Sequence, residues 1–405
     1  MRRSTPRLAG VALVTIAGLV LVGCSSKAPS ATSTGSSGGL SIQPVMQIDK
    51  DGKEVKSQAG GAPATPAGNG SATCDSTVTI AMAGALTGSN AALGINISNG
   101  AQLAIKQHNA ANKDCQVQYK GFDTEGDPAK APAVATQIIN NANVIGLIGP
   151  AFSGETKATG AAFHDAGLLS LTASATNPDL TKNGWTNFFR GLANDAVQGP
   201  SVAAYLVNTA GFKKVCVVQD DSDYGVGLAQ QMTQGLGSAA DKGCALSVKA
   251  GDKDFSAAVQ SIKSAAPDAI FYAGYYAEAA PFAAQLRDGG VTATFVSDDG
   301  SNDPQFVKQA GSAAKGALLS CPCGPAPADF ETAYKAQFGV GSGVYSVEAY
   351  DLATIILKAI DGGAKTRADV VNFVKSYSGD GLARHYQWDA NGELSSALIW
   401  IYQVK

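Results

Sequence analysis

The sequence predicts an α/β fold, in which two similar lobes each carry a parallel sheet covered by helices. From about residue 74 onward, apolar runs of strand length alternate with helical patterns, a rhythm typical of parallel sheets with helices on both faces. The rhythm pauses near residues 188–192 and then restarts. The stretch from Cys74 to Lys405 is too long for one ordinary domain and fits two.

The first set of elements begins after Cys74. Pro150 stops one apolar run, and Gly167 is a typical residue after a helix end. The patterns predict strands at 78–82, 116–122, 144–149 and 168–171, with helices at 96–109, around 134–139 and at 153–166.

The second set follows the pause with the same alternation. The patterns predict a helix at 197–209, a strand at 214–218, a further helix, a strand at 245–248, a helix at 255–265, and strands at 269–273 and 294–297. Two α/β lobes in series are expected to hold a ligand in the cleft between them.

Hydroxyl side chains follow two neighbouring strands of the first set. Ser153 opens a predicted helix, and Thr172, Ser174 and Thr176 lie in the next loop. Ligands of open α/β sheets bind at the carboxyl ends of the strands, and a helix start suits a carboxylate. A plainer alternative stays open: Ser153 only caps its helix, and Thr172 is structural.

The amino terminus has the pattern of an export signal. Arg2, Arg3 and Arg7 precede an apolar run at 8–22 that is too short to span a bilayer comfortably. Leu21-Val22-Gly23-Cys24 resembles a bacterial lipobox, which predicts a lipoprotein signal peptide over 1–23 and a lipid on Cys24. Residues 24–75 are rich in Ser, Thr, Ala, Gly and Pro and are expected to form a flexible tether, with a weak hairpin signal around Asp51-Gly52.

Charge and cysteine content narrow the function classes. The net charge is −3, and no basic run follows Arg7, which argues against nucleic acid partners. Six of the seven cysteines remain after Cys24, and disulfides are expected in an exported chain. Their positions beside consecutive strands favour Cys74–Cys115 and Cys216–Cys244, which leaves Cys321 and Cys323 together. The three histidines lack metal-ligand spacing, so we expect no metal site.

Catalytic motifs are incomplete. The run from Gly225 to Gln230 lacks the third glycine of a dinucleotide fingerprint, and no phosphate-binding loop lysine is present. Ser153 stands in Ala-Phe-Ser-Gly-Glu, which is not a nucleophile elbow. We therefore expect a protein that is not an enzyme and uses no cofactor.

Several motifs carry a resemblance to a known family. They are Gly84-Ala85-Leu86-Thr87-Gly88, Phe122-Asp123-Thr124-Glu125-Gly126-Asp127-Pro128, Tyr224-Gly225-Val226-Gly227-Leu228-Ala229, Asp254-Phe255-Ser256, Phe271-Tyr272-Ala273-Gly274-Tyr275, Ala349-Tyr350-Asp351 and Gln387-Trp388-Asp389-Ala390-Asn391-Gly392. From Val78 to Val404 the chain resembles the type I periplasmic solute-binding proteins, specifically the leucine/isoleucine/valine-binding branch.

The resemblance implies two Rossmann-like lobes joined by a three-strand hinge. It places the crossings near Gly191, Ser320 and His385. Lobe 1 would comprise residues 76–191 and 321–384, and lobe 2 would comprise residues 192–320 and 385–405.

The resemblance also implies a ligand site. Ser153 matches the serine that receives the ligand carboxylate, and Ser174 and Thr176 match the loop whose backbone and hydroxyl hold both the carboxylate and the amino group. Asp299 matches the acidic partner of the ammonium group, which is usually glutamate. The second lobe would close over the ligand with Tyr224 and Tyr275. Leu93 stands where the family often has an aromatic residue, and Tyr345 where it often has phenylalanine. A buried zwitterion needs donors at one end and a carboxylate at the other, so the chemistry agrees.

The implied protein is a lipid-anchored, extracytoplasmic monomer. By the resemblance, it would capture an aliphatic or branched-chain amino acid and deliver it to the permease subunits of an ABC transporter. Two alternatives stay open: a binder of an amide, urea or aromatic acid with the same fold, or a ligand sensor. Asp299 favours a primary amine over urea or amides.

Overall fold

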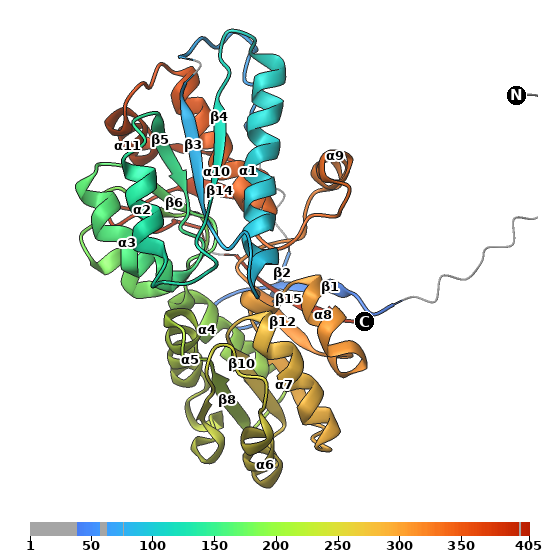
Figure 1. The fold of residues 1–405 in the computed structure, drawn as a ribbon. Helices are drawn as coiled ribbons and strands as arrows, with labels where there is room; N and C mark the ends of the chain where they lie inside the picture. The colour runs from blue at the N-terminus through green and yellow to red at the C-terminus, as the bar shows by residue number, and fades with distance from the viewer. Residues whose placement is uncertain (1–38, 57–62, 76, 397) are drawn as a thin grey trace, which may run out of the picture. The chain divides into compact units, whose positions relative to one another are not determined.

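The computed structural model describes residues 39–56, 63–75, 77–396 and 398–405 (Figure 1). The expected signal peptide, Cys24 and much of the expected tether lie outside these ranges. Among the described residues, none of the helices combines the length and apolar character needed to cross a bilayer.

A five-stranded parallel sheet forms from the first set of elements. Its order is β4-β3-β5-β6-β7. The strands are β3 (Thr79–Gly84), β4 (Gln118–Asp123), β5 (Val144–Ile148), β6 (Leu169–Thr172) and β7 (Phe188–Arg190). All four strands expected from apolar runs are present, and β7 occupies the region where the rhythm pauses.

Helices cover both faces of this sheet, as Figure 1 shows for α1 and α2 on opposite sides of β3. Side chains of β3 alternate: Ile80 and Met82 join the core that includes α1 and α10, while Ala81 and Ala83 join the core with α2 and α3. The helices are α1 (Ala91–Ala111), α2 (Ala131–Ile139), α3 (Ser153–Asp165), α9 (Ala328–Phe338), α10 (Ser346–Asp361) and α11 (Arg367–Ser376). A small hairpin, β13 (Ser378–Asp380) with β14 (His385–Gln387), follows α11.

The eight-stranded sheet has the order β2-β1-β15-β12-β11-β10-β8-β9. Its parallel strands are β8 (Val215–Gln219), β9 (Leu246–Ser247), β10 (Ala269–Ala273), β11 (Thr294–Ser297) and β12 (Leu318–Cys321). Strand β15 (Ile399–Val404) pairs antiparallel with β12. The helices are α4 (Asp195–Ala204), which continues into a π-helical turn at Tyr205–Thr209, α5 (Asp223–Leu236), α6 (Ser256–Ala265), α7 (Tyr276–Asp288) and α8 (Pro304–Ala310).

Part of the expected tether is folded. Residues Ile42–Ile48 form β1, which pairs antiparallel with β15, and Glu54–Val55 form β2 beside it. The hairpin expected around Asp51-Gly52 is therefore present. Two contacts stabilise the hairpin. Ile48 is buried in the core of the eight-stranded sheet, and Thr209 Oγ1 donates a hydrogen bond of 2.9 Å to Gly52 O. The general composition of 24–75 concealed this short β segment.

The chain passes repeatedly between the elements of the two sheets. It does so between β7 and α4, between β12 and α9, and between β14 and β15. Because β1 and β2 belong to the eight-stranded sheet, the chain also passes between the sheets from β2 to β3. That makes one connection more than the resemblance implied.

The structure contains the two expected disulfides. Cys74 is bonded to Cys115, with their Cα atoms 4.6 Å apart, and Cys216 is bonded to Cys244, with Cα atoms 5.3 Å apart. Cys321 and Cys323, whose pairing the sequence left open, are bonded to each other.

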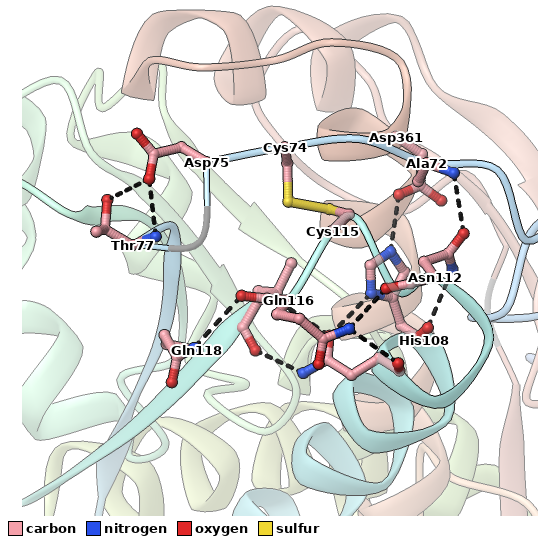
Figure 2. The surroundings of a disulfide bond; sticks show 12 residues. Ala72, Cys74, Asp75, Thr77, His108, Asn112, Cys115, Gln116, Gln118 and Asp361 are labelled. Atoms are coloured by element: carbon pink, nitrogen blue, oxygen red, sulfur yellow. Dashed lines mark hydrogen bonds and ion pairs between the residues drawn. A yellow bond between two sulfur atoms is a disulfide. The ribbon is translucent and has the colours of Figure 1, made fainter.

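Figure 2 shows how the segment before β3 is held around the first of these bonds. Asn112 Oδ1 accepts a hydrogen bond of 3.0 Å from the Ala72 N–H, and His108 Nε2 lies 2.8 Å from Asp361 Oδ1. The bridge and these bonds fix residues 72–75 against the ends of α1 and α10.

Candidate functional site

A cavity lies at the carboxyl ends of the parallel strands of both sheets. Segments that follow β5, β6, β8, β10 and β11 each contribute to its wall, as expected for α/β sheets. The lining residues are Leu93, Ile97, Ala151, Phe152, Ser153, Ser174, Tyr224, Tyr275, Asp299, Gly300 and Tyr345. Seven of the eight predicted ligand residues are thus brought together.

Ser153 begins α3 and is buried at the cavity wall. Its Oγ accepts a hydrogen bond of 3.2 Å from the Asn177 N–H, so the hydroxyl hydrogen is available to donate. Ser153 is the first helical residue, and the preceding Phe152 occupies the cap position. The alternative that Ser153 merely caps the helix is therefore wrong.

Glu155 fixes the start of α3 from behind. One oxygen accepts a bond of 3.2 Å from the Phe152 N–H, and the other accepts from Thr124 Oγ1 in the loop after β4. Burial raises the pKa of Glu155 to about 7.

The loop after β6 is braced by its own side chains. Thr172 Oγ1 donates to Pro150 O at 2.9 Å and accepts from the Ala175 N–H at 3.0 Å, which gives Thr172 the structural role expected for it. Ser174 Oγ donates to Ala151 O at 2.5 Å, and its remaining lone pairs can accept.

Arg190 holds the same loop from the end of β7. Its guanidinium is fully buried and donates to Ala175 O, to Asn177 O at 3.0 Å and to Glu393 at 3.1 and 3.2 Å. The Arg190 guanidinium therefore positions the loop that carries Ser174, because its planar set of donors can bond to several acceptors at once.

Thr176 is the predicted ligand residue that the structure does not place in the cavity wall. It is fully buried in the same loop, and its carbonyl accepts the Asp195 N–H at 3.0 Å. Its Oγ1 has no hydrogen-bond partner within the described part of the chain.

Asp299 lies on the opposite side of the cavity, in the turn after β11. Its Oδ1 accepts bonds of 2.8 Å from Gln198 Nε2 and 2.8 Å from Tyr224 Oη, and its Oδ2 accepts 2.6 Å from Tyr345 Oη. All three partners are neutral groups. Burial raises the pKa of Asp299, while the bonds from Tyr345, Gln198 and Tyr224 oppose the rise.

The tyrosines around Asp299 are kept neutral. Burial, reinforced by the nearby carboxylates, holds the pKa of Tyr224, Tyr275 and Tyr345 well above the usual value, so each hydroxyl remains a donor. Tyr275 stacks edge-on against Phe152, with ring centroids 5.1 Å apart, and thereby joins the two sides of the cavity.

Backbone geometry at two positions serves this arrangement. Tyr345 has a φ of +66°, uncommon for a bulky side chain, and this conformation directs its hydroxyl to Asp299 just before α10 begins. At Gly300, a Cβ would lie 2.6 Å from Gly274 O and 3.0 Å from the Tyr224 ring. Only glycine therefore allows Asp299 and Tyr224 to approach each other as they do.

Sequence reasoning missed several residues of the site. Ile97, Ala151, Phe152 and Gly300 adjoin predicted residues: Ile97 lies one helical turn after Leu93, and the others are sequence neighbours of Ser153 or Asp299. Gln198 was missed for another reason. It lies in a helix whose apolar pattern gave no sign that a polar side chain points inward.

The arrangement can bind a small molecule with two opposite ends. The Ser153 hydroxyl and the start of α3 can donate to an anionic group, and Asp299 can accept from a cationic group. Between them, Leu93, Ile97 and Ala151 offer an apolar surface.

Comparisons with known proteins agree with this geometry. A model of the family described as periplasmic binding protein matches residues 77–405. The leucine-specific-binding protein of Salmonella typhimurium is 30% identical over 334 residues, which cover 80% of this chain and 90% of that protein. The leucine-, isoleucine-, valine-, threonine- and alanine-binding protein of Pseudomonas aeruginosa is 29% identical, covering 81% of this chain and 90% of its own length.

Solved structures give the same result. The branched-chain amino acid transporter substrate binding protein LivJ from Streptococcus pneumoniae, in complex with isoleucine, superposes with a TM-score of 0.75 at 29% identity. The match covers 81% of this chain and 99% of LivJ. The type I fold predicted from the sequence is confirmed, and the chain belongs to the periplasmic binding protein family.

Proposed function

We propose that this protein captures an aliphatic amino acid in the cavity between its two sheets and delivers it to the permease of an ABC transporter. One observation carries the proposal. Asp299 is a buried carboxylate held only by neutral donors, and it faces the Ser153 side of a cavity whose middle is apolar. An amino acid supplies the missing cation, the anion for Ser153 and an apolar side chain.

The names of the relatives support this ligand class. The Salmonella relative is named for leucine, and the Pseudomonas relative for five small or branched amino acids. LivJ was solved with isoleucine and is named as a transporter substrate-binding protein. Ser153 would receive the carboxylate, and the loop of Ser174 and Thr176 would contact both the carboxylate and the amino group. Asp299, Tyr224, Tyr275 and Tyr345 would complete the site when the lobes close.

The ligand class is tested by a thermal-shift screen followed by calorimetry. The screen contains L-leucine, L-isoleucine, L-valine and L-alanine, with 4-methylpentanoate, isopentylamine, urea and benzoate as comparisons. We expect the amino acids to raise the melting temperature more than the compounds that lack one of the two charges. A response to urea or benzoate without any response to amino acids would exclude the proposal.

The role of Asp299 is tested with Asp299→Asn and the best amino acid of the screen. Removing the buried counter-charge of an ammonium group costs about 2–5 kcal/mol, roughly thirtyfold to several-thousandfold in dissociation constant. Glu278→Gln is the matched control, because Glu278 is also a buried acid near the eight-stranded sheet but does not line the cavity. Equal affinity of both variants would contradict the assigned role.

We also propose that the protein is a lipid-anchored monomer outside the cytoplasm, attached through Cys24. The support is the lipobox pattern together with the extracytoplasmic setting that the family implies. A Cys24→Ala protein should leave the membrane fraction, since the diacylglyceryl group would supply the anchor. If the variant stays as membrane-bound as the parent, Cys24 is not the anchor. Sedimentation of the soluble variant tests the monomeric state.

A further inference from the structure

Asp195 is a buried acid beside the proposed ligand site that none of the interactions described above explains. It is the first residue of α4 and is fully buried, and its N–H is bonded to Thr176 O. One helical turn later on the same helix, Gln198 binds Asp299. Asp195 therefore lies on the same face of α4 as Gln198, behind the cavity lining, and close enough to Asp299 for their charges to interact.

The side chains around Asp195 leave several polar atoms unsatisfied. In the structure as described, hydrogen-bond partners are lacking for Asp195 Oδ1, Asp195 Oδ2, Thr176 Oγ1 and Gln198 Oε1. A protonated Asp195 can donate one hydrogen bond, but once Asp195 is ionised its two oxygens and Gln198 Oε1 can only accept. Buried polar groups are normally paired, so this group of acceptors indicates a place for a donor.

The groups around Asp195 do not neutralise the negative charge that it would carry when ionised. Arg190 is the nearby cation, but its guanidinium is bonded to Glu393 and to two carbonyl groups of the ligand loop. The other charged or titratable groups that face Asp195 are Asp299, Glu393, Tyr224 and Tyr345. Burial, followed by the charge of Asp299, raises the pKa of Asp195 to about 8, while the nearby Thr176 side chain and the charge of Arg190 oppose the rise, so the carboxyl is largely protonated at neutral pH.

Asp299 alone cannot satisfy an ammonium group. A carboxylate has about four acceptor positions, and Gln198, Tyr224 and Tyr345 already occupy three of those on Asp299. An ammonium group has three hydrogens to donate. Among the described residues, the buried side-chain acceptors without a partner on this side of the site include those of Asp195 and Thr176, together with Asp298 Oδ1 beside Asp299.

We propose that Asp195 is a second carboxylate partner of the ligand's ammonium group and gives up a proton to the solvent when that group binds. The inference rests on the proposed amino-acid function. In the empty protein the neutral carboxyl avoids an unpaired charge. On binding, the Asp195 O–H bond breaks, the proton leaves to buffer, and the carboxylate pairs with the incoming cation.

The experiment is calorimetry with L-leucine as the probe, in phosphate and in Tris, at pH 5.5, 6.5 and 7.5. The difference between the two buffers measures the protons released. We expect about one proton per L-leucine at pH 6.5 in the parent, and an affinity that rises up to about tenfold per pH unit. Asp195→Asn should bind at least about tenfold more weakly at pH 7.5, the loss expected from one hydrogen bond to a charged group. Its proton release should be smaller by about one.

Glu278→Gln is the control and should match the parent in both affinity and proton release. Asp195→Ser, which keeps a small polar residue at the helix start, replaces Asp195→Asn if that variant does not fold. An Asp195 variant that binds and releases protons like the parent overturns the inference, while L-leucine binding itself still stands. Failure of every amino acid to bind the parent would instead overturn the proposed function.

Discussion

Asn96 Nδ2 donates a hydrogen bond of 3.0 Å to Asp303 Oδ2. Asn96 belongs to α1, which packs on the five-stranded sheet, and Asp303 caps α8, which packs on the eight-stranded sheet. A second link of this kind joins Lys157 of α3 to Asp223 of α5 at 2.6 Å. Both links lie beside the cavity and join the two sides whose closure the proposed function requires.

Asn96→Ala should favour the open form. The Asn96–Asp303 bond is partly buried, and a hydrogen bond of this kind contributes about 1 kcal/mol, or roughly fivefold in affinity if it forms only on closure. Calorimetry with the best amino acid measures the loss, and small-angle scattering should show a larger radius of gyration at subsaturating ligand.

Lys157→Ala is the matched comparison for Asn96→Ala, because it removes the second link between the two sides of the cavity. The side chain of Lys157 is 66% exposed, and exposed ion pairs contribute little. The affinity of Lys157→Ala for the amino acid should differ from that of the parent by less than twofold, or about 0.4 kcal/mol. A larger effect from Lys157→Ala than from Asn96→Ala would show that burial does not decide which link matters.

Ser153→Ala should weaken amino-acid binding without altering the fold. The variant removes one hydrogen bond to the ligand carboxylate, a loss of about 1.5–3 kcal/mol, or roughly tenfold to 150-fold. Ser264→Ala is the control, because Ser264 is exposed on α6 and bonds only to Gln260 O of its own helix. If the affinity for the amino acid is unchanged in Ser153→Ala, the carboxylate is bound elsewhere.

Much of this architecture was predictable because its signals are local. The apolar runs of β5 and β10 are buried on both faces, and such strands read as continuous hydrophobic stretches. Ser153 and Ser174 were found because parallel strands bring the loops after them to the same edge. Asp299 was assigned from the resemblance, and the structure places it in the cavity wall.

Other features depend on contacts between distant segments. Gln198 and Asp195 lie in the first turn of α4, and only the path of the chain after β7 turns them toward Asp299. The pairing of β1 with β15 was missed because it joins the start of the described chain to its far end. Thr176 was matched by position, but the loop turns its side chain behind the wall of the cavity.

The disulfide Cys74–Cys115 should stabilise the protein substantially. It spans a sequence separation of 41 residues, and loop-closure entropy for such a loop corresponds to about 3–4 kcal/mol. The paired variant Cys74→Ser/Cys115→Ser should lose stability of this size in denaturant unfolding. Non-reducing peptide mapping of the parent checks the pairing, and a peptide that joins Cys74 to Cys216 would contradict it.

The stability of the ligand-free protein should fall as the pH rises from about 5 to 8. Burial raises the pKa of Glu155 and of Asp351 to about 7 and that of Asp220 to about 6, from ordinary values near 4.5 or 3.8. In this window the folded protein binds more protons than the unfolded chain, and stability therefore declines with rising pH. The decline should end only above the pKa of about 8 to which burial raises Asp195. Urea unfolding at half-unit steps of pH measures it.

Glu155→Gln isolates one contribution to this slope. Glutamine at the third position of α3 can still bond to the Phe152 N–H, so the cap is retained while the titrating group is lost. The variant should lose less stability than the parent between pH 5 and 7, and the two curves should run parallel above pH 8. Lys157→Ala, which changes an exposed charge on the same helix, should keep the parent's slope. A parent protein that becomes more stable from pH 5 to 8 would show that these buried acids are ionised in the folded state, because their bonds to nearby N–H and hydroxyl donors then outweigh burial.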